Sequence, residues 1–318
     1  MVALLLVGQM ILPANPQETP GPVNAVQLTG LAGVKDNAKG TLRVENGNLQ
    51  FAYGKKHSDL GATSIQDIVT GADSEKAVGK TVGMISMAAP YGGGRFLSLF
   101  RKKIDTLSVQ YHDGDGAVHG AIFTLPVGAA DGIKKELVAQ GAATASTGEP
   151  NQGASSRSSS PNKEDKVAVS QEQKPGKMKA SAVQVKMIES DEIRLPAEFR
   201  IALYENLVKQ LEKAGKFQRI YRDGDNNASR AAELVVLHSS VRGFKAGSER
   251  ARQVTTVAGA TSIVVHCQFT DADGQSLLER DVNGKVRFFG GNLKATYDFA
   301  KKAAHITDEN FSAGAGKQ

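Results

Sequence analysis

Short apolar segments alternate with turn signals between residues 28 and 142. Leu42, Val44, Leu49 and Phe51 alternate with polar residues on either side of Asn46-Gly47. An Asn-Gly pair in that position is typical of a two-residue β-hairpin. Further strands are predicted at residues 65–69, 82–87, 95–100, 104–111 and 119–125, and helical spacing predicts a closing helix through Ala129, Ile133 and Leu137.

Residues 143–182 have a different composition, dominated by Ser, Gly, Ala, Lys, Gln and Pro. Val167, Val169 and Met178 are the largest apolar residues in this segment. Such a stretch buries too little apolar surface to offset the entropy of ordering it. The composition therefore predicts a disordered linker and two domains that move independently.

A second pattern of strands and helices occupies residues 183–311. Residues 183–188 alternate like a strand, and Pro196 opens a helix in which Phe199, Leu203, Leu207 and Leu211 recur every four residues. Gly215 predicts the end of that helix. Strands are predicted at residues 217–221, 234–244, 255–257, 261–269 and 276–282, with a turn at Asn283-Gly284 and a last helix over residues 293–306.

These patterns together predict an α+β protein. The first domain, residues 28–142, is expected to be mostly antiparallel β and closed by a C-terminal helix. The linker over residues 143–182 is then followed by an α+β domain, residues 183–311, in which two helices pack on an antiparallel sheet.

The order of strands and helix in the first domain resembles the PH-like or GRAM-like barrel. The resemblance is carried by Gly40-Thr41-Leu42 with Leu49 and Phe51, by Ile65 and Ile68, and by Ile122-Phe123 before the helix. It implies a barrel that binds a peptide, a protein or a phospholipid head group. Lipid-binding members carry basic residues in their first hairpin loops, whereas the turn here begins with Glu45.

The second domain resembles a bacterial family known only as domain of unknown function 4410. The matching pieces are the helix over residues 199–217, the strand over residues 232–236, residues 242–247 with Ala251-Arg252, the strand that precedes the turn at residues 271–274, and Gly290-Gly291. The resemblance implies an extracytoplasmic α+β domain and carries no catalytic residues.

The first twelve residues, MVALLLVGQMIL, form an apolar run. The run is shorter than a spanning helix and has the length of a signal-peptide core, with a cleavage position after Ala14. No positive residue precedes it, so a buried first strand or an uncleaved interfacial anchor remain alternatives. We expect a signal peptide over residues 1–17 and a periplasmic or secreted protein.

The formal charge of +6 is spread along the 318 residues rather than gathered in one segment, which argues against a nucleic-acid partner. The basic clusters of the first domain are Lys55-Lys56 and Arg101-Lys102-Lys103. These five residues are the candidate contacts for an anion or a lipid head group, and ordinary solvated surface is the alternative.

No residue pattern predicts catalysis, a metal or a cofactor. The two Asp-x-Asp-Gly turns, at Asp113 and Asp271, lack the acidic residue that ends a calcium loop. His112 and His119 flank one hairpin without a third ligand. His266 and the single cysteine, Cys267, are adjacent on a strand, where alternation directs them to opposite faces.

The sequence therefore predicts a non-enzymatic, exported envelope protein that acts as a binding or scaffolding module. Its expected partner is another envelope protein that pairs with an exposed β-strand edge. An anionic lipid or polyanion binder is the alternative, and an uncharacterised hydrolase is a remote one. Nothing in the sequence specifies the oligomeric state.

Overall fold

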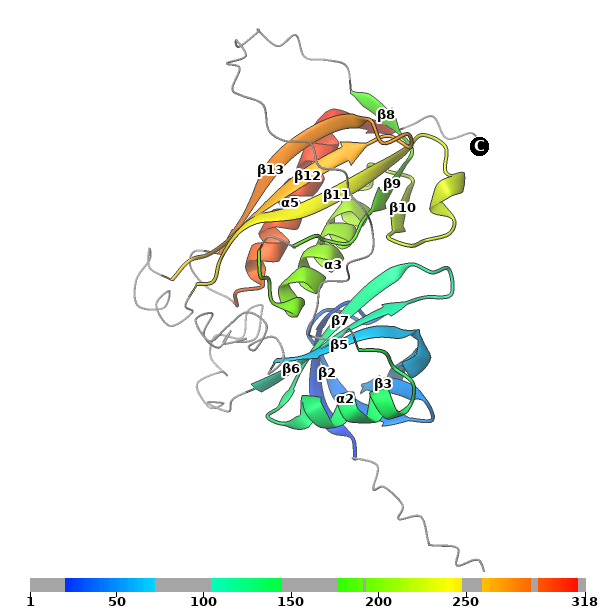
Figure 1. The fold of residues 1–318 in the computed structure, drawn as a ribbon, viewed down its shortest axis with the longest axis vertical. Coiled ribbons are helices and arrows are strands. Elements are labelled where there is room, and N and C mark those ends of the chain that lie inside the picture. The colour runs from blue at the N-terminus through cyan, green and yellow to red at the C-terminus, as the bar shows by residue number, and fades with distance from the viewer. Residues whose placement is uncertain are drawn as a thin grey trace, which may run out of the picture.

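The computed structural model describes residues 21–71, 104–144, 177–190, 193–247, 259–286 and 291–313. These residues form two domains that lie one above the other along the long axis in Figure 1. The predicted signal segment, the predicted strands over residues 82–87, 95–100 and 255–257, and most of the predicted linker lie outside the described residues.

The first domain is built on a seven-stranded antiparallel sheet in the order β4-β3-β2-β1-β7-β6-β5. Its strands are β1 (Val23–Thr29), β2 (Ala38–Glu45), β3 (Asn48–Tyr53), β4 (Lys56–Gly61), β5 (Ile65–Thr70), β6 (Ile104–His112) and β7 (Val118–Pro126). The short 3₁₀ turn η1 (Ala62–Ser64) separates β4 from β5.

The predicted hairpin at Asn46-Gly47 is confirmed. Glu45 pairs with Asn48, and the two turn residues both have a positive φ, 51° for Asn46 and 76° for Gly47. A turn of that kind needs residues that tolerate the left-handed region, which Asn and Gly do.

Helix α2 (Ala129–Ala139) follows β7, as predicted, and buries Ala130, Ile133 and Leu137 against the sheet. The predicted closure of the strands into a barrel is not seen, because β4 and β5 stand at the two ends of the sheet and do not pair with each other. The shown architecture is an open antiparallel sheet whose core side is covered by α2.

The second domain has a five-stranded sheet in the order β10-β9-β11-β12-β13, with α3 and α5 on one face (Figure 1). Its elements are β9 (Ala182–Val185), α3 (Ala197–Ala214), β10 (Arg219–Arg222), η3 (Ala228–Arg230), β11 (Leu234–Lys245), β12 (Thr261–Thr270), β13 (Ser276–Val286) and α5 (Lys294–Asn310). Gly215 ends α3 with a φ of 60°, as predicted.

The sheet of the second domain is mixed, so the prediction of an antiparallel sheet is wrong in part. Strands β11, β12 and β13 are antiparallel, but β9 runs parallel to both β10 and β11. The chain leaves β9, forms α3 and returns as β10, and a strand–helix–strand unit of this kind places its strands parallel.

The predicted turn at Asn283-Gly284 is also wrong, because β13 continues through it to Val286. A Cβ atom on Gly284 would lie 2.1 Å from the Ala295 carbonyl oxygen and 2.8 Å from Phe299 Cβ. Glycine here marks the close approach of helix α5 to the strand rather than a turn.

The second domain begins before Val183, inside the segment predicted as linker. Strand β8 (Met178–Ala180) pairs in parallel with β14 (Phe311–Ala313), so the two ends of the domain are joined. Phe311 is fully buried and contacts Phe217 and Phe269. This pairing of distant residues leaves no trace in local composition.

Among the described residues, none of the helices combines the length and the apolar character needed to cross a membrane.

We predict that Gly284→Ala destabilises the second domain by about 1–3 kcal/mol, because the added methyl group would push β13 away from α5. Gly243→Ala in strand β11 of the same sheet is the matched control, since the nearest side-chain atom to its added Cβ, on Val264, would lie 3.6 Å away. Denaturant unfolding of both variants measures the difference. Equal stabilities would contradict the packing argument.

Candidate functional site

The two domains are in contact, contrary to the expectation that they move independently. Leu28 and Ile122 of the first domain pack on Ile201 and Ala202 of α3 in one buried apolar cluster. Gly120 permits this approach, because a Cβ atom there would lie 2.5 Å from Ile201 Cγ2. The composition of a linker predicts whether the linker itself is ordered, but it carries no information on whether the two domains that it connects have complementary surfaces.

A buried ion pair lies at the centre of this junction. The Glu205 carboxylate of α3 is 1% exposed and accepts two hydrogen bonds from Arg222 of β10, at 2.8 Å and 2.9 Å. The backbone N–H of Gly120, in β7 of the other domain, donates to Glu205 Oε1 at 2.9 Å. Burial opposes the charge of Arg222, but the Glu205 carboxylate outweighs it and raises the Arg222 pKa.

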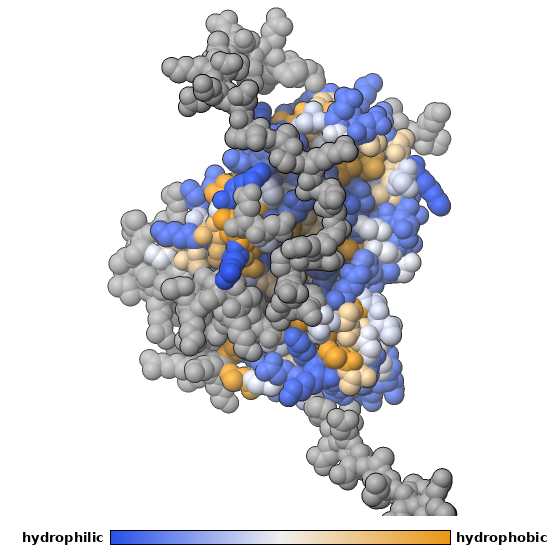
Figure 2. All heavy atoms as spheres, viewed as in Figure 1, coloured by the Kyte–Doolittle hydropathy of each residue, from blue (hydrophilic) through white to orange (hydrophobic). Residues whose placement is uncertain are grey.

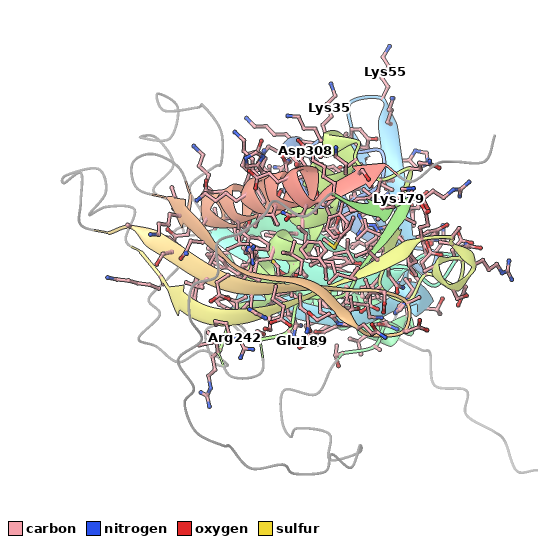
Figure 3. All side chains as sticks on the ribbon, turned by 90° about the horizontal axis from the view of Figure 1, so that it is seen from above. Lys35, Lys55, Lys179, Glu189, Arg242 and Asp308 are labelled. Atoms are coloured by element: carbon pink, nitrogen blue, oxygen red, sulfur yellow. The ribbon has the colours of Figure 1, made fainter. Side chains whose placement is uncertain are left out.

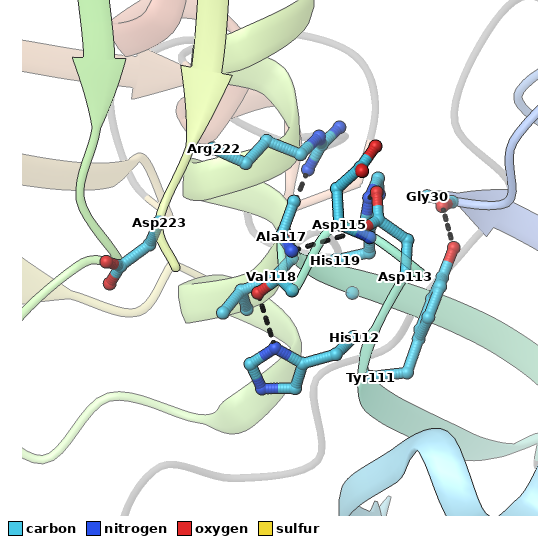
Figure 4. A network of polar contacts seen from close by, with 12 residues as sticks. Gly30, Tyr111, His112, Asp113, Asp115, Ala117, Val118, His119, Arg222 and Asp223 are labelled. Carbon is cyan, nitrogen blue, oxygen red and sulfur yellow. Dashed lines mark hydrogen bonds and ion pairs between the residues drawn. The ribbon is translucent and has the colours of Figure 1, made fainter. Parts of the chain in front are cut away.

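The β6–β7 hairpin also docks on the second domain through its backbone. Val118 N–H donates to the Asp223 carbonyl at 2.8 Å, and Asn226 N–H donates to the Asp115 carbonyl at 3.1 Å. Arg222 Nη1 donates to the Val118 carbonyl at 3.3 Å (Figure 4). Backbone groups of the two domains therefore form hydrogen bonds with one another at the junction.

The loop that receives the hairpin is held in place by Asp223. Its carboxylate pairs with Lys186 at 2.5 Å and accepts the Met187 N–H at 3.0 Å. Burial alone would raise the Asp223 pKa, but these donors hold it below its ordinary value. The Asp223 N–H donates to the Tyr204 hydroxyl oxygen at 2.9 Å, which ties the loop to α3.

His119 lies beside this ion pair, on the side of the first domain (Figure 4). Its ring stacks on Tyr111 with centroids 5.2 Å apart, and its Nε2 atom is 2.9 Å from Asp113 Oδ2. Burial and then the Arg222 guanidinium lower the His119 pKa, and the nearby carboxylates Asp113 and Glu205 offset this only in part. Burial raises the Tyr111 pKa to about 12.

Four exposed lysines lie at one end of the seven-stranded sheet, and we call this group the lysine end: Lys35, Lys39, Lys55 and Lys56. Tyr53 Oη lies 3.5 Å from the Gly33 carbonyl, which places the β3–β4 turn beside the loop between β1 and β2. Figure 3 shows Lys35 and Lys55 projecting on the same side of the molecule.

The nearest acidic residue of the β1–β2 loop, Asp36, is already paired. Lys209 of α3 lies 2.6 Å from its carboxylate and also donates to Thr29 Oγ1 at 2.8 Å. Two of the predicted anion contacts, Lys55 and Lys56, belong to the lysine end, and the structure adds Lys35 and Lys39 to them. Arg101, Lys102 and Lys103 lie outside the described residues.

The outer edges of the two sheets differ in accessibility. At the edge of β13, Asp298 accepts the Lys285 N–H, Lys302 donates to the Asn283 carbonyl, and Arg280 donates to the Glu279 carbonyl. Strand β4 begins at Lys56 within the lysine end, and no strand of the described residues pairs with its outer edge. The edge of β4 is therefore the better candidate for strand addition.

Ser240, His266 and Asp281 face one another in register across β11, β12 and β13. His266 Nδ1 is 2.8 Å from Asp281, as in a catalytic triad, but Nε2 turns toward Glu279 at 3.9 Å. The Nε2 contact is longer than a hydrogen bond, and within the described residues no side-chain hydrogen bond joins Ser240 to His266, so the row lacks the nucleophile–base contact of a triad. The row stabilises the sheet as cross-strand pairs.

The cysteine and the turn predictions are confirmed. Cys267 is fully buried on the core face of β12, and burial raises its pKa to about 12. Asp113 and Asp271 each accept backbone N–H groups of their own turns, as turn residues do. No group of three or more metal-ligating side chains comes together in the described ranges.

The sequence did not single out Glu205 or Arg222, and His119 was considered only as a metal ligand. One signal was present in the apolar stripe of α3, which Ile201, Tyr204 and Val208 make wider than one buried face requires. A helix with so wide a stripe is covered on two sides, and a carboxylate inside it needs a partner.

We predict that Glu205→Gln lowers the free energy of unfolding by about 3–5 kcal/mol, because it leaves the Arg222 charge buried without a counter-charge. Asp298→Asn, which breaks the exposed pair with Lys302, is the control and costs at most about 1 kcal/mol. Denaturant titration measures both, and similar losses for the two variants would refute the role of burial.

No family model and no curated protein matches this chain. Among solved structures, it is similar to a PelC dodecamer from Paraburkholderia phytofirmans, at 14% identity and a TM-score of 0.32, covering 42% of this chain and 89% of that one. A Caulobacter crescentus CB15 protein described as a lipoprotein matches at 17% identity and a TM-score of 0.23, covering 38% and 82%. A Helicobacter pylori homolog of a neuraminyllactose-binding hemagglutinin matches at 13% identity and a TM-score of 0.24, covering 44% and 89%.

Proposed function

We propose that this chain is a non-enzymatic binding module, exported to the cell envelope, whose first domain is PH-like and whose second domain belongs to the 4410 family. Its partner is an envelope protein that contributes an extended acidic segment. The hydrophobic N-terminal run supports export. The order of seven antiparallel strands followed by a helix supports the PH-like assignment.

The observation that carries the proposal is the position of the lysine end at the start of β4. Strand β4 is six residues long, and no strand of the described ranges pairs with its outer edge, toward which alternate residues turn their N–H and C=O groups. Lys55 immediately precedes β4, Lys56 is its first residue, and both side chains are exposed. An added strand would gain main-chain hydrogen bonds from β4, and its acidic side chains would meet the lysines.

The side chains of β4 also favour a polar partner. His57 and Asp59 are exposed, with His57 Nε2 3.4 Å from Asp59 Oδ2, and only Leu60 is buried. Figure 2 shows hydrophilic residues over most of the described surface on the face it presents, with apolar residues in small groups. Recognition by charge and backbone pairing therefore fits the chain better than a broad apolar contact.

An anionic lipid surface or a polyanion is the second candidate, because the same four lysines favour it. Lys209 neutralises Asp36, so the lysine end presents mainly positive charge. A membrane would need the lysines alone, whereas a protein segment would also need the edge of β4.

We predict that the hexapeptide Glu-Val-Glu-Val-Glu-Val shifts the backbone amide resonances of β4, and that Lys55→Glu/Lys56→Glu weakens this binding at least about tenfold by charge repulsion. The double variant Lys213→Glu/Lys301→Glu changes the net charge equally at two exposed positions elsewhere and serves as the control. A Lys-Val hexapeptide is expected not to bind.

Sedimentation with phosphatidylserine vesicles separates the two candidates. Lysine-dependent vesicle binding without any peptide effect on β4 would favour the lipid surface, and its strength would fall steeply with salt. Shifts on β4 without vesicle binding favour the protein segment. Absence of both would contradict the proposal.

A further inference from the structure

His119 occupies the one position in β7 whose two neighbours both hold the second domain. The carbonyl of Val118, on one side of it, accepts from Arg222, and the N–H of Gly120, on the other side, donates to Glu205. The peptide groups on either side of the imidazole are therefore bound to the two members of the buried ion pair. A change at the ring is transmitted directly to the junction.

The charges that face the His119 ring come from both domains. Asp113 of the β6–β7 loop and Tyr111 of β6 touch it from the first domain. Arg222 of β10 and Glu205 of α3 act on it from the second domain, with opposite signs. His112, the neighbour of Tyr111, also lies at the junction: its Nδ1 is 2.7 Å from the Gly116 carbonyl, and its Nε2 is buried without a hydrogen-bond partner in the described part of the chain.

We propose that the junction is a pH-sensitive latch, in which protonation of His119 releases the β6–β7 hairpin from α3 and β10 under mildly acidic conditions. A proton on the ring adds a second positive charge beside the Arg222 guanidinium at a site where the side chain is only 14% exposed. Separation of the domains returns both groups to water.

The direction of the effect follows from the closed junction. Burial and Arg222 hold the His119 pKa below its ordinary value of 6.5 in the closed state. Opening removes the Arg222 guanidinium and part of the burial while Asp113 stays beside the ring, so the open state has the higher His119 pKa and binds the proton more readily. The closed state is therefore fully stable above the open-state pKa and loses stability as the pH falls toward the lowered pKa of the closed state.

Release would uncover the apolar cluster at the junction. Leu28, Ile122 and Ile201 are buried only where the domains meet. An open form consequently exposes apolar surface from both domains, which a hydrophobic dye detects independently of any hydrogen-bond measurement.

Amide hydrogen exchange in the full-length chain tests the latch at pH 7.5, 6.0 and 5.0, after correction for intrinsic exchange rates. The Gly120, Val118 and Asn226 amides cross the junction, and their protection is expected to fall with pH. The fall amounts to about tenfold for each unit by which the His119 pKa differs between the two states. The Val265 amide, within the β11–β12–β13 sheet, should stay protected.

His119→Gln keeps an amide donor for Asp113 and removes the titration, so it should hold the three amides protected at pH 5.0. His305→Gln, at an exposed histidine of α5 that pairs with Glu309, should retain the wild-type fall. Unchanged protection in the wild type, or an equal fall in His119→Gln, would overturn the proposal.

Should His119→Gln weaken the junction at every pH, the latch can still be tested directly in the wild type. The carbon and proton resonances of the His119 ring report its pKa. A midpoint below 6.5 that coincides with the loss of protection and with dye binding supports the latch. A midpoint that does not coincide with them overturns it.

Discussion

The buried carboxylate of Glu205 is the constraint on which the arrangement of the two domains depends. A charged group with 1% exposure is stable only when donors surround it, and its donors come from two different domains. Arg222 approaches from β10, and the Gly120 amide approaches from β7. Separation of the domains would leave the carboxylate with the arginine alone, so burial of Glu205 and closure of the junction are one event.

Helix α3 extends this constraint to the proposed binding surface. Glu205 and Lys209 are one helical turn apart on the face of α3 that meets the first domain. Glu205 holds β7, whereas Lys209 holds Asp36 in the loop that also carries Lys35. The charge presented by the lysine end therefore depends on α3 staying in place, because withdrawal of Lys209 would free a carboxylate beside the lysines.

Local patterns in the sequence predicted the elements well and their long-range relations poorly. The Asn46-Gly47 hairpin and the end of α3 at Gly215 were predictable, since each is set by the backbone preference of one or two residues. The prediction of a turn at Gly284 was wrong. Glycine is needed there because helix α5, more than ten residues away along the chain, leaves no room for a Cβ atom. The pairing of β8 with β14 joins residues 178 and 311 and had no local signal at all.

The junction shows why a linker-like composition says little about domain freedom. Because the two domains belong to one chain, each is held at a raised effective concentration near the other, so a contact of modest strength is sufficient to close them. Such a contact does not need a large apolar area, and a small cluster with one buried ion pair fulfils the role. A charge added to a single ring beside Arg222 shifts a contact of this kind more readily than it would shift an extensive hydrophobic interface.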